Sequence, residues 1–204
     1  MSLVLGPIHY WLFNKIKLQN EIVDEIILFA NNKYKELNLE EGMSEFGTLP
    51  TNDLEQAIDV QNIHGWLQEC VSIVEYRLAY GVTKILQAEP KEMESLSQLF
   101  FEFGKNQNVL DKNSTLKECY KVFNDMLLDG MPCDHANRLI EQDENQVVWQ
   151  RELCVHKEYF DSVGGDIKNY YMLRDEFIKG LLYNTNISYD KLDEVTFKIT
   201  LNIQ

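Results

Sequence analysis

The feature that most constrains the fold is a change in apolar spacing after Pro132. Before this residue, apolar side chains recur every three or four positions, as they do on amphipathic helices. After it, the segments Gln146–Cys154 and Phe197–Ile203 mix β-branched and aromatic residues with polar ones, which is typical of strands. We therefore expect an α+β fold in which an N-terminal helical bundle packs on a small C-terminal antiparallel sheet.

The expected organisation has a helical region over residues 1–131 and a strand-containing α+β region over residues 132–204. Because a small sheet can bury its apolar face only against helices, we expect both regions to form one compact unit. In the first region, Asn52 with Glu55 and Thr115 with Glu118 predict N-terminal capping pairs, and Gly104 predicts a C-terminal cap. The helices expected there cover residues 7–34, 52–85, 90–104 and 115–130, with a loop over residues 38–51.

In the second region, Ala136–Gln142 fits either a helix or the first strand of a hairpin that turns at Asp143–Asn145. We favour the hairpin. His156–Val163 predicts a short helix, and Asp166 predicts the cap of the next one. Further strands are expected over residues 187–189 and 197–203.

The charge of the chain limits its partners. With 33 acidic and 19 basic residues, its formal charge of -14 repels nucleic-acid phosphates and anionic lipids, so neither is expected as a primary partner. No apolar run approaches the ~20 residues that span a bilayer. Four cysteines are too few for a disulfide framework in a chain of this length, which favours a reducing compartment and hence the cytoplasm.

Two Cys-x-His elements, Cys133-Asp-His135 and Cys154-Val-His156, form the main polar constellation, since phosphate-binding loops and common catalytic motifs are absent. On an extended strand, residues i and i+2 share a face, so each element could aim a thiolate and an imidazole at one point. Two such pairs would complete a tetrahedral zinc site. The alternative is that the cysteines are small buried side chains, with a Cys133–Cys154 disulfide also compatible with some registers.

A second metal hypothesis uses His9 and His64, because a helical bundle with histidines and carboxylates is typical of iron proteins. Hemerythrin-like sites need more than four histidines, and the Glu-x-x-His pairs of ferritin-like sites are absent. Solvated or buried structural histidines are the alternative.

Cys154 is also a candidate nucleophile, because His156 and the helix that follows could lower the pKa of its thiol. Along a strand, however, Cys154 and His156 would lie about 6–7 Å apart, so direct contact requires a turn. Asp175, on the helix after Gly165, is a further catalytic candidate; its alternative is a solvated helix face beside Arg174 and Glu176.

The order of these features over Val147–Ile203 is a strand, Cys154, a short helix, Gly164-Gly165, a helix with Asp175, Phe177 and Gly180, and a terminal strand. This order resembles the L-2-amino-thiazoline-4-carboxylic acid hydrolase-like family. The resemblance implies a helix-covered sheet with a small-molecule pocket, and the positions carried over are Cys154, Gly164 and Asp175.

The leading hypothesis is therefore a small-molecule-binding protein that hydrolyses a carbon–nitrogen bond, with Cys154, His156 and Asp175 near its pocket. One alternative is a non-catalytic zinc or iron protein. Another is an interaction module whose aromatics, including Trp11, Trp66 and Trp149, lie in the core or in a dimer interface, so a homo-oligomer stays open.

Overall fold

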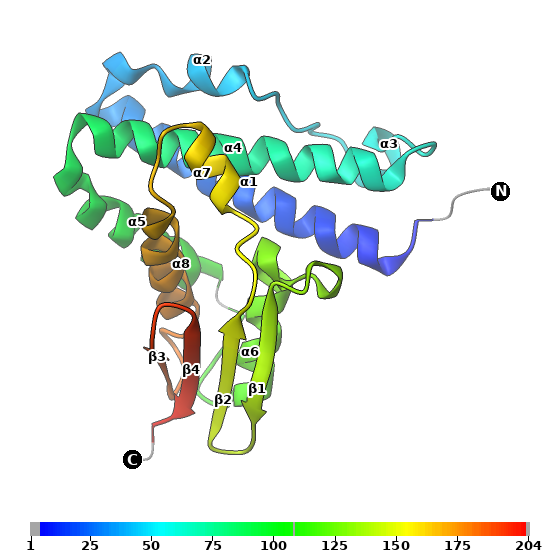
Figure 1. Cartoon of the computed structure of the whole chain (residues 1–204), viewed down its shortest axis with the longest axis vertical. Coiled ribbons are helices and arrows are strands. Elements are labelled where there is room, and N and C mark those ends of the chain that lie inside the picture. The colour runs from blue at the N-terminus through cyan, green and yellow to red at the C-terminus, as the bar shows by residue number, and fades with distance from the viewer. Residues whose placement is uncertain (1–4, 108, 203–204) are drawn as a thin grey trace. The chain divides into compact units, whose positions relative to one another are not determined.

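The computed structural model describes residues 5–107 and 109–202 and has the expected α+β fold, with an antiparallel sheet near the C-terminus (Figure 1). It divides into two compact units. The first comprises Met1–Met93 and His156–Asn169, and the second comprises Glu94–Val155 and Tyr170–Gln204. The predicted boundary at residue 131 follows secondary structure, whereas the units follow packing; a single compact body stays a prediction.

The helices are α1 (Pro7–Lys33), α2 (Leu39–Ser44), α3 (Leu54–Ala57), α4 (Ile63–Ala88), α5 (Met93–Gln107), α6 (Leu116–Met126), α7 (Lys157–Ser162) and α8 (Ile167–Leu181). Short 3-10 helices are η1 (Lys35–Leu37), η2 (Pro90–Glu92), η3 (Leu128–Gly130) and η4 (Pro132–Asp134). The strands are β1 (Asn137–Gln142), β2 (Gln146–Arg151), β3 (Ile187–Lys191) and β4 (Thr196–Leu201).

Helices α1 and α4 form the long packing pair of the first unit and run parallel. Near their starts the rings of His9 and His64 lie 5.3 Å apart, and further along Gln19 Nε2 donates to Glu75 Oε1 at 3.0 Å. Because earlier residues of α1 contact earlier residues of α4 and later residues contact later ones, the two helices run in the same direction (Figure 1). The connection through η1, α2 and α3 returns the chain to the starting end, and α7 packs on α4.

Two expectations for this connection are wrong. The predicted loop contains α2, in which Leu39 and Met43, four positions apart, are buried. Asn52 does not cap the next long helix, because α4 begins only at Ile63, where Asn62 Oδ1 accepts the Gly65 N–H at 3.2 Å. The predicted first helix is confirmed, since α1 begins at Pro7 and ends one residue before the expected position.

Gly104 is not the C-terminal cap of α5, which continues to Gln107. Its Cα faces α8, where an added Cβ would lie 2.3 Å from the Phe177 carbonyl oxygen. In return, a Cβ on Gly180 of α8 would lie 2.1 Å from the Phe101 carbonyl oxygen of α5. The two glycines therefore allow two helix backbones to approach closely, which periodicity alone did not indicate.

The sheet of the second unit has the strand order β1-β2-β4-β3, antiparallel throughout, so the predicted hairpin is confirmed and β1 and β3 are its edges (Figure 1). Facing pairs Val147–Ile199 and Trp149–Phe197 are buried. Helix α6 packs on this face, with the Tyr120 ring 5.3 Å from that of Trp149. The other face is mainly polar, with Gln, Thr, Lys, Ser and Asp at positions 146, 150, 196, 198, 200, 188 and 190.

Several predicted boundaries are confirmed. Thr115 and Glu118 form the expected capping box at the start of α6: Thr115 Oγ1 accepts the Glu118 N–H at 3.2 Å, and Glu118 accepts the Thr115 N–H at 2.8 Å. Asp166 Oδ1 accepts the Lys168 N–H at 2.9 Å at the start of α8. The terminal strand ends at Leu201, and Ile203 lies outside the described residues.

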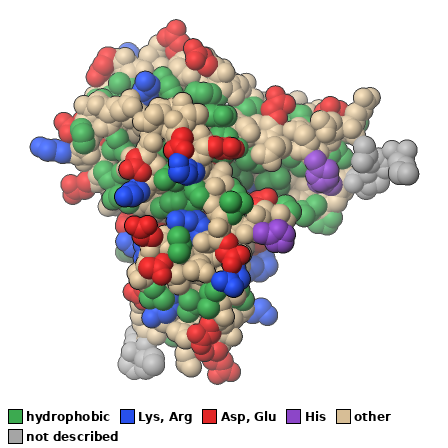
Figure 2. Space-filling model, in the orientation of Figure 1, with side chains coloured by type: hydrophobic (Ala, Val, Ile, Leu, Met, Phe, Trp, Pro, Cys, Tyr) green, Lys and Arg blue, Asp and Glu red, His purple; other side chains and the backbone are tan. Residues whose placement is uncertain are grey.

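The acidic side chains form no single patch on the face of the molecule that Figure 2 shows. Asp and Glu side chains are spread over the visible face, with Lys and Arg among them (Figure 2). No helix in the described part of the chain is long and apolar enough to cross a membrane.

Candidate functional site

Cys154 lies just beyond the end of β2, in the second unit. The N–H groups of Glu152 and Leu153 both donate to the Ala136 carbonyl, at 2.8 and 3.2 Å, which holds this stretch against the residue that precedes β1. Cys154 is half-buried. The expectation that Cys154 and His156 lie on an extended strand is wrong, because β2 ends at Arg151 and the chain bends before α7.

Two side chains order the surroundings of the thiol. Tyr171 of α8 donates its hydroxyl to Cys154 Sγ at 3.1 Å, and the Arg151 guanidinium lies 3.6 Å from the centre of the Tyr171 ring. Burial, and then the hydrogen bond to Cys154, raise the pKa of Tyr171, while Arg151 opposes this shift. The phenol therefore stays protonated near neutral pH and acts as a donor toward sulfur.

Asn137 of β1 lies directly opposite Arg151 of β2 in the sheet register. Arg151 Nη2 donates to the Glu194 carbonyl at 3.1 Å, and Asn137 Nδ2 donates to the Asp129 carbonyl at 3.0 Å. Their other polar atoms, Arg151 Nη1 and Asn137 Oδ1, are buried without a hydrogen-bond partner among the described residues. Because Asn137 and Arg151 are partners in the register, both side chains start from the same face of the hairpin.

We call Asn137, Arg151, Cys154 and Tyr171 the Cys154 cluster. A buried ion pair joins α8, which carries Tyr171, to η3: Arg174 Nη2 is 3.2 Å from Asp129 Oδ2. Burial opposes the charge of Arg174, but Asp129 offsets it and the net effect raises its pKa. This pair keeps α8 attached to the segment that leads into β1, and so supports the cluster.

Asp175 also belongs to α8, four positions after Tyr171. Its Oδ1 accepts the Tyr189 hydroxyl at 2.6 Å, and Lys191 Nζ lies 3.6 Å from Oδ2. Asp175 therefore connects α8 to β3. No direct contact joins it to Cys154 among the recorded interactions, and a catalytic role for Asp175 stays a prediction.

His156 lies in the first unit and is fully buried, at 0% exposure. Its Nδ1 is 3.0 Å from both carboxylate oxygens of Glu75, which also accepts the Gln19 amide. These three side chains connect α1, α4 and the start of α7. Their geometry makes His156 a structural partner of Glu75, and its predicted role beside Cys154 stays untested.

Cys133 and His135 are exposed and lie just before β1 in the chain. They do not lie on a strand as expected: Cys133 is within η4, and His135 has the left-handed φ of 49°. Among residues 5–107 and 109–202, no group of three or more His, Cys, Asp and Glu side chains is arranged to hold a metal ion. The zinc set Cys133, His135, Cys154 and His156 gains no support and stays a prediction. All four cysteines are thiols.

The two histidines of the iron hypothesis do meet, but edge to face, with an interplanar angle of 67°. His9 Nδ1 accepts the Gly6 N–H at 2.9 Å, so this nitrogen is already used. His9 and His64 belong to no group of three or more candidate metal ligands among the described residues, so the iron hypothesis gains no support and stays a prediction.

An open groove of about 1010 Å³ lies elsewhere in the second unit, between the start of α6, the hairpin turn and the ends of β3 and β4. Lys112 and Lys117 face it together with Asp143 and Glu144. The capping box already uses donors of the first turn of α6. The groove thus concentrates neither sign of charge, and the Cys154 cluster is the better candidate site.

The sequence indicates Cys154 as a candidate but not the side chains that surround it. The sequence pattern indicates Arg151 and Asn137 only as strand residues, although a positive charge at the end of a buried strand is a signal for a polar site. Glu75 was also missed, although it interrupts the apolar stripe between Val71 and Leu78 of α4. No sequence pattern indicated that Tyr171 would reach the thiol.

Comparison with protein-family models, with curated proteins and with solved structures finds no match to this chain.

Proposed function

We propose that this protein binds a small molecule with an amide-like group at the Cys154 cluster. The observation that carries the proposal is the pair of buried, unpartnered atoms Arg151 Nη1 and Asn137 Oδ1 on facing residues. An amide presents a carbonyl acceptor and an N–H donor side by side, which complements this donor and acceptor. Binding would relieve the cost of leaving both atoms buried without hydrogen bonds.

Hydrolysis of the ligand's carbon–nitrogen bond is the activity proposed for this site, in line with the family resemblance. The Cys154 sulfur would bond to the carbonyl carbon, the carbon–nitrogen bond would break, and the nitrogen would take the thiol proton. Water would then cleave the thioester, releasing the acid and restoring the thiol. A cytoplasmic location is proposed with it, because all four cysteines are thiols.

The test uses two fragments that differ in one hydrogen-bond donor, 2-pyrrolidinone and N-methyl-2-pyrrolidinone. At ten times its dissociation constant a ligand stabilises the folded state by about 1.4 kcal/mol, which raises the melting temperature by about 3–6 °C in a chain of this size. We expect this shift with the first fragment only. Equal shifts, or none with either, would contradict the proposal.

Protein variants locate the effect. Arg151→Gln and Asn137→Ser should abolish the shift, whereas Lys198→Gln, on the polar face of β4, should retain it. Hydrolysis is measured separately, as ring opening of cyclic amides. Cys154→Ser should stop ring opening without removing binding; ring opening that persists in Cys154→Ser would exclude the nucleophilic role.

A further inference from the structure

Strand β1 is an open edge of the sheet, and its side chains are exposed from Arg138 to Gln142. Its centre carries two apolar residues, Leu139 and Ile140, which are 43% and 49% exposed. Charged side chains on an edge strand usually prevent it from pairing with a strand of another chain. Both edges expose charged residues, Asp190 and Lys191 on β3 and Arg138 and Glu141 on β1, but of the two only β1 also exposes large apolar side chains.

A register shift in β1 alters which side chains share a face. Leu139 pairs with Trp149, but Glu141 pairs with Val148, so one extra residue is inserted between them. In a regular strand Arg138 and Glu141, three positions apart, would point to opposite faces. Here Arg138 faces Gln150 and Glu141 faces Val148, which lie on the same face of β2.

We propose that β1 pairs with β1 of a second copy of this chain, antiparallel, to join two sheets into one. A two-fold axis between Leu139 and Ile140 places Arg138 opposite Glu141 of the other copy, and Asn137 opposite Gln142. Because Arg138 and Glu141 share a face of β1, both Arg138–Glu141 pairs between the two copies can form on the same face of the joined sheet. The exposed apolar residues meet at its centre.

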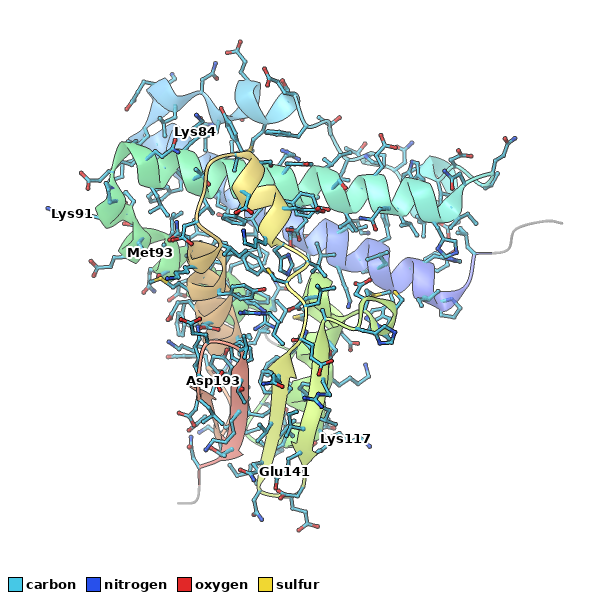
Figure 3. All side chains as sticks on the ribbon, in the orientation of Figure 1. Lys84, Lys91, Met93, Lys117, Glu141 and Asp193 are labelled. Carbon is cyan, nitrogen blue, oxygen red and sulfur yellow. The ribbon has the colours of Figure 1, made fainter. Side chains whose placement is uncertain are left out.

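The charges present on β1 fit this pairing. Arg138 already contacts Glu152 and donates to Gln150 Oε1 at 3.0 Å, which holds its guanidinium over the outer face of the sheet. Glu141, labelled in Figure 3 near the hairpin turn, has no ion-pair partner among the described residues. The second copy supplies that partner, because the symmetry requires each Glu141 to meet an Arg138.

The expected association is weak, because a single pair of six-residue strands buries less area than a standard protein–protein interface. A dissociation constant on the order of 10–100 µM is expected, and sedimentation equilibrium between about 5 and 500 µM should show a monomer–dimer transition. A protein that is monomeric throughout this range overturns the proposal. Dimerisation unaffected by the variants below also overturns it.

Charge reversal tests the register. Arg138→Glu and Glu141→Arg each place like charges across the seam, so each should raise the dissociation constant at least about 10-fold. Mixed one to one, these two variants restore opposite charges in both pairs and should form a heterodimer of native affinity, as should the double variant with itself. Glu144→Arg, in the hairpin turn, makes the same charge change as Glu141→Arg and should leave the affinity within about 2-fold. Circular dichroism verifies that every variant is folded, and a mixture that fails to dimerise contradicts the pairing.

Discussion

In the first unit the buried carboxylate of Glu75 is contacted by both Gln19 and His156, whereas in the second unit two buried atoms of Arg151 and Asn137 have no such partners among the described residues. Cys154, which belongs to the second unit, and His156, which belongs to the first, are only two positions apart in the sequence. The hydrogen bonds of Glu75 stabilise the first unit, whereas the unpartnered atoms of the Cys154 cluster are the basis of the binding site proposed above.

Thiol reactivity gives the largest expected contrast. Burial raises the pKa of the Cys70 thiol to about 11 and that of Cys119 to about 12, so both are almost fully protonated at pH 8. Cys133 is exposed and Cys154 is half-buried. With an aromatic disulfide reagent at pH 8, we expect Cys70 and Cys119 to react at least about 1000-fold more slowly than Cys133, because they require opening of the fold.

Peptide mapping of the labelled protein identifies which thiols react, and urea provides the control in which all four should react together. Cys154 should be labelled in the native protein. Simultaneous labelling of all four thiols without urea would show that neither unit protects its cysteine.

Removing a partner of the buried Glu75 carboxylate should cost most in stability. His156→Ala leaves the Glu75 carboxylate buried without its imidazole partner, which should lower the free energy of unfolding by about 3–5 kcal/mol. His64→Ala, at an exposed position of α4, should change it by less than about 0.5 kcal/mol. Urea denaturation measures both, and equal effects would refute a stabilising contact between His156 and Glu75.

In the second unit, the corresponding stabilising element is the close approach of α5 and α8 at Gly104 and Gly180. Gly180→Ala adds a methyl group where only 2.1 Å separates the Cβ position from the Phe101 carbonyl oxygen, so the helices must move apart. Overpacking of this kind should cost about 1–3 kcal/mol. Lys179→Ala, the exposed neighbour, is the control in the same urea experiment, and a Gly180→Ala variant as stable as this control would rule out the close crossing.

The smallest effect is expected at the start of α6. Thr115→Ala removes the acceptor for the Glu118 N–H and should cost about 1 kcal/mol. Thr115→Ser retains the hydroxyl and should keep most of that stability. If the two variants unfold at the same urea concentration, the capping box contributes nothing measurable.

Local patterns predicted much of the fold because their physical causes are local. The capping pair Thr115–Glu118 and the turn at Asp143–Asn145 are formed by residues close in sequence, and both were found. The prediction of a C-terminal cap at Gly104 is wrong, because the sequence does not distinguish a glycine that ends a helix from one that lets a second helix approach closely. The partner is Phe177, more than seventy residues away.

The candidate site was predicted only in part for the same reason. The sequence alone makes Cys154 a candidate nucleophile, because a cysteine is one by residue type, but Tyr171 reaches it only through the packing of α8. Asn137 faces Arg151 only because the hairpin takes this register.

The periodicity change after Pro132 determined an α+β chain with a C-terminal antiparallel sheet, since side-chain spacing decides which face of each element is apolar. Only the tertiary structure decided that Cys154 and His156 belong to different units, and that an inserted residue in β1 brings Arg138 and Glu141 onto one face. Both depend on contacts between segments distant in sequence, and spacing along a single segment carries no information about them.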